Sequence, residues 1–185
     1  MVQAIIGHMT TVILGEHPEV QAMIEQRRAL GQDGSDEVWE GVYYMVPHAH
    51  VHHALVQTRL GRVLEDQTLS RGFEVTGEFN LGDLDDFRVP DLGIHRNEPD
   101  GLYVPTAAMV VEILSPNDAT YKKFDFYGRH EVEEILVVDP AEQSVQLWRF
   151  DGSISSYRES DRSVILATSR QELRSAIRWP GTARS

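Results

Sequence analysis

The sequence contains no cysteine, and it also lacks the marks of a secreted or membrane-bound protein. Without cysteine, neither a disulfide nor a zinc site built from thiolates can form. No apolar run approaches the roughly 18 residues that a membrane-spanning helix needs. The opening MVQAIIGHM has neither the basic region nor the long apolar stretch of a signal peptide. We therefore expect a cytoplasmic protein that does not enter a membrane.

Basic residues are also scarce, with 17 Lys and Arg against 29 Asp and Glu and a formal net charge of −12. Because Lys and Arg supply most of the non-specific affinity for phosphates, this balance excludes a protein that coats nucleic acid. It does not exclude an enzyme that meets phosphates through metal ions, because the ligands of such ions are themselves acidic. The sequence has no Walker loop, Rossmann fingerprint or G-x-S-x-G elbow.

The 185 residues have an ordinary hydrophobic fraction of 41% and are expected to form one domain, 1–185. Residues 1–15 are expected to lie outside its core. They are either loosely ordered or partly the remnant of an added tag, since "GHM" precedes a native-like start at Met9.

The order of predicted elements indicates the fold class. Apolar residues recur at helical spacing in three stretches, and five strand-like stretches and one short helix lie between or after them. The helical stretches are 16–30, 50–69 and 169–179, the short helix is 119–130, and the strand-like stretches are 37–46, 73–81, 87–96, 107–114 and 133–140. The first of these, 37–46, is either one strand or a hairpin, because it contains a glycine. Residues 144–159 are typical of a C-terminal β-hairpin around "DGS". We therefore predict an α/β fold with a mixed β-sheet flanked by helices.

Glu112 stands out because it lies inside the apolar run AMVVEILSP, which otherwise reads as a strand buried on both faces. An ionised carboxylate in such a place costs several kcal/mol unless it is paired, hydrogen-bonded or bound to a metal. The rest of the chain should therefore contain groups that compensate its charge.

Asp91, in VPDLGI, is the first candidate neighbour of Glu112. The two strand-like segments are joined by a loop with Pro, Gly and Asn, so they can lie side by side and place both carboxylates at one edge of the core. "SPND" then ends the second strand and supplies Asn or Asp as a cap for the next helix, where Lys122 or Lys123 can fold back towards Glu112.

Two acids and a lysine at a sheet end have a known chemical use. One or two carboxylates suit Mg²⁺, and a bound Mg²⁺ polarises a phosphoryl oxygen while the lysine neutralises charge that develops at phosphorus. From spacing alone, a buried ion pair without chemistry is an equally open interpretation.

Four segments extend this pattern. They are EVWEGVYYMVP, FRVPDLGIHR, VVEILSP and KFDFYGRHEVEEILVVDP, and together they span 37–140. "PD" followed by a distant "E-x-x" resembles the half-split motif of the PD-(D/E)XK nuclease superfamily. The four segments resemble, in the same order, the Uma-type family of restriction-endonuclease-like proteins, formerly a domain of unknown function. The resemblance implies a restriction-endonuclease-like fold with 37–140 as the nuclease-like core.

The resemblance also implies roles for individual residues. Asp91 matches the "PD" aspartate, Glu112 the glutamate, and Lys123 the lysine four positions before the helix tyrosine, Tyr127. The sequence departs from the superfamily pattern because Leu114 occupies the lysine position of "E-x-K", so that Lys123 must replace it.

Two further positions match the family pattern. Glu40 matches an acid before the first-strand glycine, and is expected to be a third metal ligand beside Asp91 and Glu112. His53, with His52 as the neighbouring option, matches a histidine that opens the next helix, and is expected to support the site or contact phosphate.

The leading hypothesis is therefore a Mg²⁺- or Mn²⁺-dependent endonuclease that hydrolyses phosphodiester bonds of DNA. By analogy with many nucleases of this fold, which match the pseudo-two-fold symmetry of duplex DNA, we expect a homodimer. The rival is an inactive nuclease-fold module for binding or assembly in a defence or mobile-element system, which the acidic composition and Leu114 favour.

Overall fold

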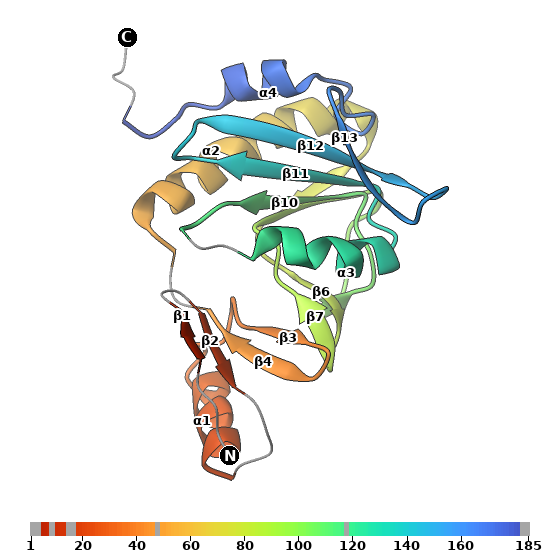
Figure 1. Ribbon diagram of the computed structural model, residues 1–185. Helices are drawn as coiled ribbons and strands as arrows, with labels where there is room; N and C mark the ends of the chain where they lie inside the picture. Colours follow the sequence, from red (N-terminus) through yellow and green to blue (C-terminus); the bar gives the residue numbers. More distant parts are fainter. Residues whose placement is uncertain (1–4, 8–9, 14–17, 47–48, 117–118, 182–185) are drawn as a thin grey trace.

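The computed structural model describes residues 5–7, 10–13, 18–46, 49–116 and 119–181 (Figure 1). Within these residues the chain forms two mixed β-sheets and four α-helices. The helices are α1 (Pro18–Ala29), α2 (Val51–Thr68), α3 (Phe124–Arg129) and α4 (Arg170–Ala176), with 3-10 turns η1 (Leu69–Arg71) and η2 (Thr120–Lys123). The predicted α/β fold with flanking helices is confirmed. None of the helices in this part of the chain is long and apolar enough to span a membrane.

The six-stranded sheet has the order β13-β12-β11-β10-β8-β5. Its strands are β5 (Glu74–Thr76), β8 (Leu92–His95), β10 (Met109–Ile113), β11 (Glu134–Asp139), β12 (Ser144–Asp151) and β13 (Ser156–Ser160). β10 and β11 are parallel, and since parallel neighbours need a crossover, the chain passes through η2 and α3 between them. β12 and β13 form the predicted C-terminal hairpin.

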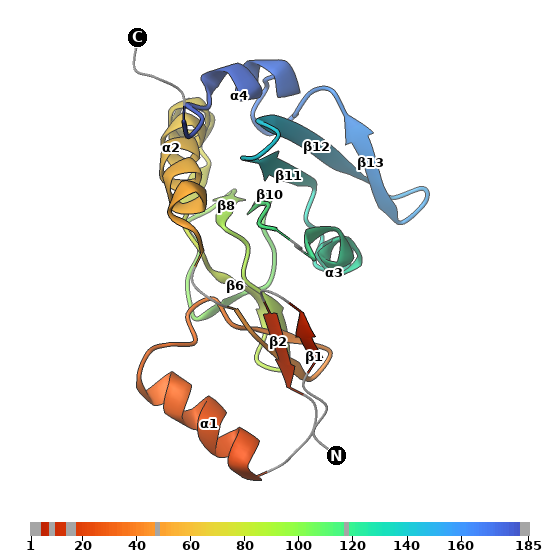
Figure 2. The same cartoon turned by 60° about the vertical axis from the view of Figure 1, so that its left-hand side comes forward.

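Helices α2 and α3 lie on opposite faces of this sheet (Figure 2). On one face, the buried residues of α2 pack against Met109, Val111 and Ile113. On the other face, α3 packs Phe126 and Tyr127 in the same cluster as Val110 and its β11 neighbours. Glu112 alternates with Val111 and Ile113 along β10, so its side chain lies on the α3 face.

The seven-stranded sheet has the order β1-β2-β4-β3-β7-β6-β9 and lies beside the first sheet, with α1 at its far end (Figure 2). Its strands are β1 (Ile5–Gly7), β2 (Thr10–Ile13), β3 (Glu37–Trp39), β4 (Val42–Met45), β6 (Asn80–Asp83), β7 (Asp86–Arg88) and β9 (Tyr103–Val104). Thus residues 5–7 and 10–13, which were expected to lie outside the core, pair within this sheet, and the rest of 1–15 is outside the described residues.

Two stretches predicted as single strands are each divided between the two sheets. Residues 73–81 form β5 in one sheet and β6 in the other, and residues 87–96 similarly contain β7 and β8. Pro90 lies at the second division, where its missing N–H cannot take part in a strand ladder. The chain therefore passes from one sheet to the other immediately before Asp91.

Candidate active site

Glu112 is 4% exposed and is the last but one residue of the buried strand β10. Its main compensating group is Lys123 from η2, whose Nζ lies 3.1 Å from Glu112 Oε1 and 3.2 Å from Oε2. Lys122 is exposed. One of the two lysines thus folds back over the strand, as the sequence predicted, and it is Lys123. Leu114, at the usual lysine position, packs against the apolar cluster on the α3 face.

Tyr127 is a second partner of Glu112 that the sequence reasoning did not identify as part of the site. It is fully buried, and its hydroxyl donates a hydrogen bond to Glu112 Oε1. The spacing contained a signal, because residues four apart on a helical segment lie on the same face, and Lys123 and Tyr127 are four apart.

Asp91 lies beside Glu112 because β8 and β10 are antiparallel neighbours. The Asp91 N–H donates to Val111 O at 3.0 Å, and Asp91 Oδ2 accepts from the Ile113 N–H at 2.6 Å. The predicted side-by-side placement of the two strands is confirmed. The carboxylate of Asp91 is consequently held rigidly at the end of β10.

His53, in the first turn of α2, contacts the other oxygen of Asp91, with Nε2 3.2 Å from Oδ1. Burial lowers the pKa of His53, but the hydrogen bond and charge of Asp91 more than offset this effect, so that the pKa is raised. His52 is exposed, so of the two histidines it is His53 that contacts Asp91. Among the described residues, the buried Nδ1 of His53 has no hydrogen-bond partner.

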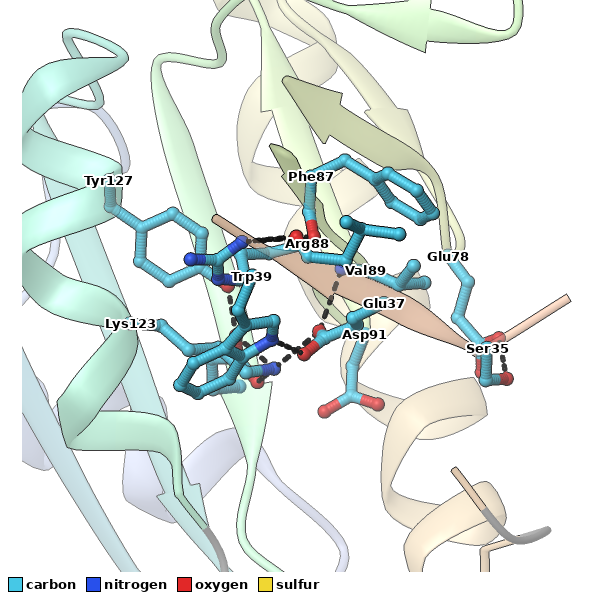
Figure 3. A network of polar contacts seen from close by, with 12 residues as sticks. Ser35, Glu37, Trp39, Glu78, Phe87, Arg88, Val89, Asp91, Lys123 and Tyr127 are labelled. Atoms are coloured by element: carbon cyan, nitrogen blue, oxygen red, sulfur yellow. Dashed lines mark hydrogen bonds and ion pairs between the residues drawn. The ribbon is translucent and has the colours of Figure 1, made fainter. Parts of the chain in front are cut away.

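Glu37 is the acid that the seven-stranded sheet contributes to this cluster. Its Oε1 lies 2.9 Å from Lys123 Nζ and accepts from the Val89 N–H at 2.8 Å, while its Oε2 accepts from Trp39 Nε1 at 2.7 Å (Figure 3). Glu37 is only 4% exposed. Lys123 therefore joins the two sheets through one acid on each.

Glu40, the predicted third metal ligand, is not brought to this cluster. It occupies the turn between β3 and β4 with φ of 50°, and its side chain is 79% exposed. Its nearest ion-pair partner is Arg129, at 3.9 Å. The physical reason is the tight turn, which directs Glu40 to solvent while Glu37, three residues earlier, lies on the paired strand.

Arg88 fixes the ring of Trp39 above Glu37. Its guanidinium lies 4.5 Å from the centre of the Trp39 ring and 4.1 Å from that of Phe126, and Nη1 donates to Val38 O at 2.7 Å. Such stacking stabilises a buried guanidinium and orders both rings. The hairpin β3–β4 is thereby attached to α3.

An outer group of polar side chains reaches the backbone of Asp91. Gln57 Nε2 donates to Asp91 O at 2.8 Å and lies 3.4 Å from Glu78 Oε1, and Glu78 in turn accepts from Ser35 at 2.9 Å (Figure 3). Glu78 is exposed, so this group lies at the solvent side of the cluster.

The electrostatics of the cluster oppose the ionisation of Glu112. Burial, together with the charges of Asp91 and Glu37, raises its pKa to about 8, against the opposing effects of Lys123 and of the Tyr127 hydrogen bond. When Glu112 is ionised, three carboxylates share one lysine and one histidine, and a divalent cation would relieve their repulsion. Among the described residues no three acids or histidines are arranged to enclose a metal ion. The neighbouring carboxylates of Asp91 and Glu112 fit a cation held by one or two carboxylates and otherwise by water, as Mg²⁺ is.

Comparisons with known proteins identify the family and the fold. The sequence model of the Uma2 family, described as "Putative restriction endonuclease", matches residues 21–176. The fold is similar to the crystal structure of a "putative nuclease belonging to DUF820" from Anabaena variabilis, with a TM-score of 0.61 and 18% identity over 78% of this chain and 92% of that chain. No curated protein matches the chain significantly. By the extent of the family match, the chain belongs to the Uma2 family and has its restriction-endonuclease-like fold.

Proposed function

We propose that the protein is an endonuclease that hydrolyses phosphodiester bonds of DNA with the help of Mg²⁺ or Mn²⁺. The observation that carries this proposal is the contact of Lys123 with Glu112, at 3.1 Å, on the strand next to Asp91. Membership of the Uma2 family supports nucleic acid as the substrate.

Asp91 and Glu112 are the residues that would hold the metal ion. When bound, the ion supplies a Lewis acid for a phosphoryl oxygen and lowers the pKa of a bound water molecule. Glu40 does not belong to this ligand set, because its side chain is 79% exposed in the turn after β3.

The other residues of the cluster would act on the substrate or on the ligands. Lys123 Nζ would donate a hydrogen bond to the attacking water or to a phosphate oxygen, where negative charge increases in the transition state. His53 would keep Asp91 oriented through Nε2 and, when protonated, would place a positive charge near the phosphate. Tyr127 would keep Glu112 Oε1 in position.

The test is a cleavage assay on supercoiled plasmid and on single-stranded DNA, with Mg²⁺, Mn²⁺ or EDTA. We expect metal-dependent nicking that falls by roughly a hundredfold or more in Glu112→Gln and Lys123→Ala, as is usual when a group that stabilises the transition state is removed. Lys122→Ala is the matched control, because Lys122 is exposed, and should cleave like the wild type. Cleavage that persists in EDTA or in Glu112→Gln would contradict the proposal.

A binding or assembly module in a defence or mobile-element system is the second candidate function. It is favoured by the pairing of Glu112 with Lys123 and Tyr127, which offsets burial without a metal, and by the net charge of −12. Calorimetry with Mn²⁺ separates the two functions. Binding that requires both Asp91 and Glu112 supports the nuclease, and an absence of binding supports the module.

The oligomeric state is part of the same proposal. A nuclease that cuts both strands of duplex DNA matches the two-fold symmetry of its substrate as a homodimer. Size-exclusion chromatography with light scattering should give twice the 20.9 kDa mass of the chain. A monomer at micromolar concentration would exclude a stable dimer without affecting the proposed chemistry.

A further inference from the structure

Glu37 is placed and occupied differently from the two acids proposed as metal ligands. Its two oxygens receive hydrogen bonds from the Val89 N–H, Trp39 Nε1 and Lys123 Nζ, at 2.8, 2.7 and 2.9 Å. Trp39 lies in β3 and Val89 directly follows β7, and both strands belong to the seven-stranded sheet. The position of Glu37 is therefore set by the seven-stranded sheet and does not depend on β10.

Lys123 and a divalent cation would compete for Glu112. Both are positive, and two cations at one buried carboxylate repel each other strongly because the interior screens charge poorly. If Glu112 were the only partner of Lys123, binding of the cation would either displace the lysine or be opposed by it. The second acid, on the other side of Nζ, removes this conflict.

We propose that Glu37 is a positioning residue that holds the Lys123 ammonium in place, so that Glu112 can exchange its ion pair with Lys123 for a divalent cation. The cation is the one of the proposed function, on which this inference rests. Glu37 itself is not proposed as a metal ligand, because the Val89 N–H and Trp39 Nε1 hold its two oxygens from its own side of the molecule, whereas the main partner of Glu112 is the exchangeable Lys123 ammonium.

The first test is a double-mutant cycle on Mn²⁺ affinity, measured by calorimetry. We expect Glu37→Gln to weaken Mn²⁺ binding by roughly tenfold, the usual cost of losing a residue that orients a metal ligand. The loss should disappear in the Lys123→Met background, since no ammonium then competes for Glu112. Glu40→Gln is the control, because it removes an acid near Glu37 whose side chain is 79% exposed and pairs with Arg129, and it should leave Mn²⁺ affinity unchanged.

The cycle separates this role from two others. If Glu37→Gln weakens Mn²⁺ binding equally with Lys123 present or absent, Glu37 is a ligand or a general structural residue, and the inference is overturned. If Glu37→Gln alone does not fold, the test is made on the double variant Glu37→Gln/Lys123→Met. The inference requires that this double variant folds and binds Mn²⁺ as Lys123→Met does.

The second test observes Lys123 directly and needs no catalytic activity. The chain contains two lysines, Lys122 and Lys123, so ¹³C labelling of lysine side chains gives one set of signals for each, with exposed Lys122 as the reference. We expect Lys123 in the wild type to stay ordered when Mg²⁺ is added. In Glu37→Gln with Mg²⁺ it should become more mobile than in the wild type.

The outcomes distinguish this inference from the proposed function. A Lys123 that stays equally ordered in Glu37→Gln with Mg²⁺, or that becomes mobile in the wild type, overturns the role of Glu37. A wild type that binds neither Mn²⁺ nor Mg²⁺ overturns the proposed function. In that case Lys123 must still be looser in metal-free Glu37→Gln than in the metal-free wild type, and unchanged order would overturn the holding role as well.

Discussion

At the scale of single residues, the protonation of Glu112 depends on its surroundings. Burial raises the pKa of its carboxyl from 4.5 to about 8, against the opposing charge of Lys123. The folded protein therefore holds a proton over a pH range in which the unfolded chain does not. The contribution of the Glu112 carboxyl to the free energy of unfolding is fully present below pH 4.5 and is lost as the pH rises through about 8.

This loss of stability at higher pH leads to a prediction for Glu112→Gln, whose side chain is neutral at every pH. The free energy of unfolding of the variant minus that of the wild type should be larger at pH 9 than at pH 6. The increase should be at least about 1 kcal/mol, since one unit of pKa shift corresponds to about 1.4 kcal/mol. Urea unfolding in EDTA at both pH values measures the difference. Exposed Glu142→Gln is the control, and a Glu112→Gln difference that does not change with pH would refute the raised pKa.

The hydroxyl of Tyr127 stabilises the ionised form of Glu112, because it donates to Oε1. In Tyr127→Phe the pKa of Glu112 should therefore rise further. Since a metal ligand must be ionised, the pH at which Mg²⁺ binding is half-complete should move upward by about one unit, equivalent to roughly 1.4 kcal/mol. Tyr157→Phe, which removes a buried hydroxyl bonded to Val132 O at 2.6 Å, should leave that pH unchanged. Calorimetric titrations across pH provide the measurement.

At the scale of elements, α1 is attached to the fold mainly by polar contacts. Ile24 is its one buried residue, whereas Arg27 donates from Nε and Nη2 to Asp36, each at 2.9 Å. Asp36 is 2% exposed and also accepts from the Tyr43 hydroxyl at 2.7 Å and the Val46 N–H at 2.8 Å. The acid thus connects the helix to the hairpin that carries Glu37.

We expect Asp36→Ala to destabilise the protein by about 3 kcal/mol, because it leaves Arg27 without its buried partner. Amide hydrogen exchange should rise first in residues 18–29. Arg28→Ala breaks only the more exposed contact with Asp33, at 4.0 Å, and should cost less than about 1 kcal/mol. Equal losses in the two variants, measured by urea unfolding, would show that Asp36 is not the attachment point.

At the scale of the whole molecule, the divalent cation of the proposed function should stabilise the folded state of this acidic chain, whose net charge is −12. A ligand that binds only the folded state at one hundred times its dissociation constant adds about 2.7 kcal/mol. For a chain of this size, saturating Mn²⁺ should raise Tm by roughly 5–10 °C. Scanning calorimetry should show this rise in the wild type and little of it in Asp91→Asn. A similar rise in both proteins would indicate unspecific binding to the acidic surface.

The main helices, the central strand and the central pair of acids follow from the sequence alone. Apolar periodicity in α2 and the apolar run of β10 are local properties of the chain, and both were predicted correctly. The neighbourhood of Asp91 and Glu112 follows from two short strands joined by a single loop. Lys123 is within reach of Glu112 because η2 is the next element after β10.

The tertiary structure decided which acid completes the cluster and where the strands divide. Glu40 was the acid predicted from the sequence and Glu37 was not considered, but the pairing of Val38 with Phe87 and the turn at Gly41 direct Glu37 inward and Glu40 to solvent. Residues 87–96 read as one strand because each half alternates correctly, and the two sheets separate them at Pro90. Local pattern determines secondary structure, whereas the direction of a side chain depends on strand register between segments distant in sequence.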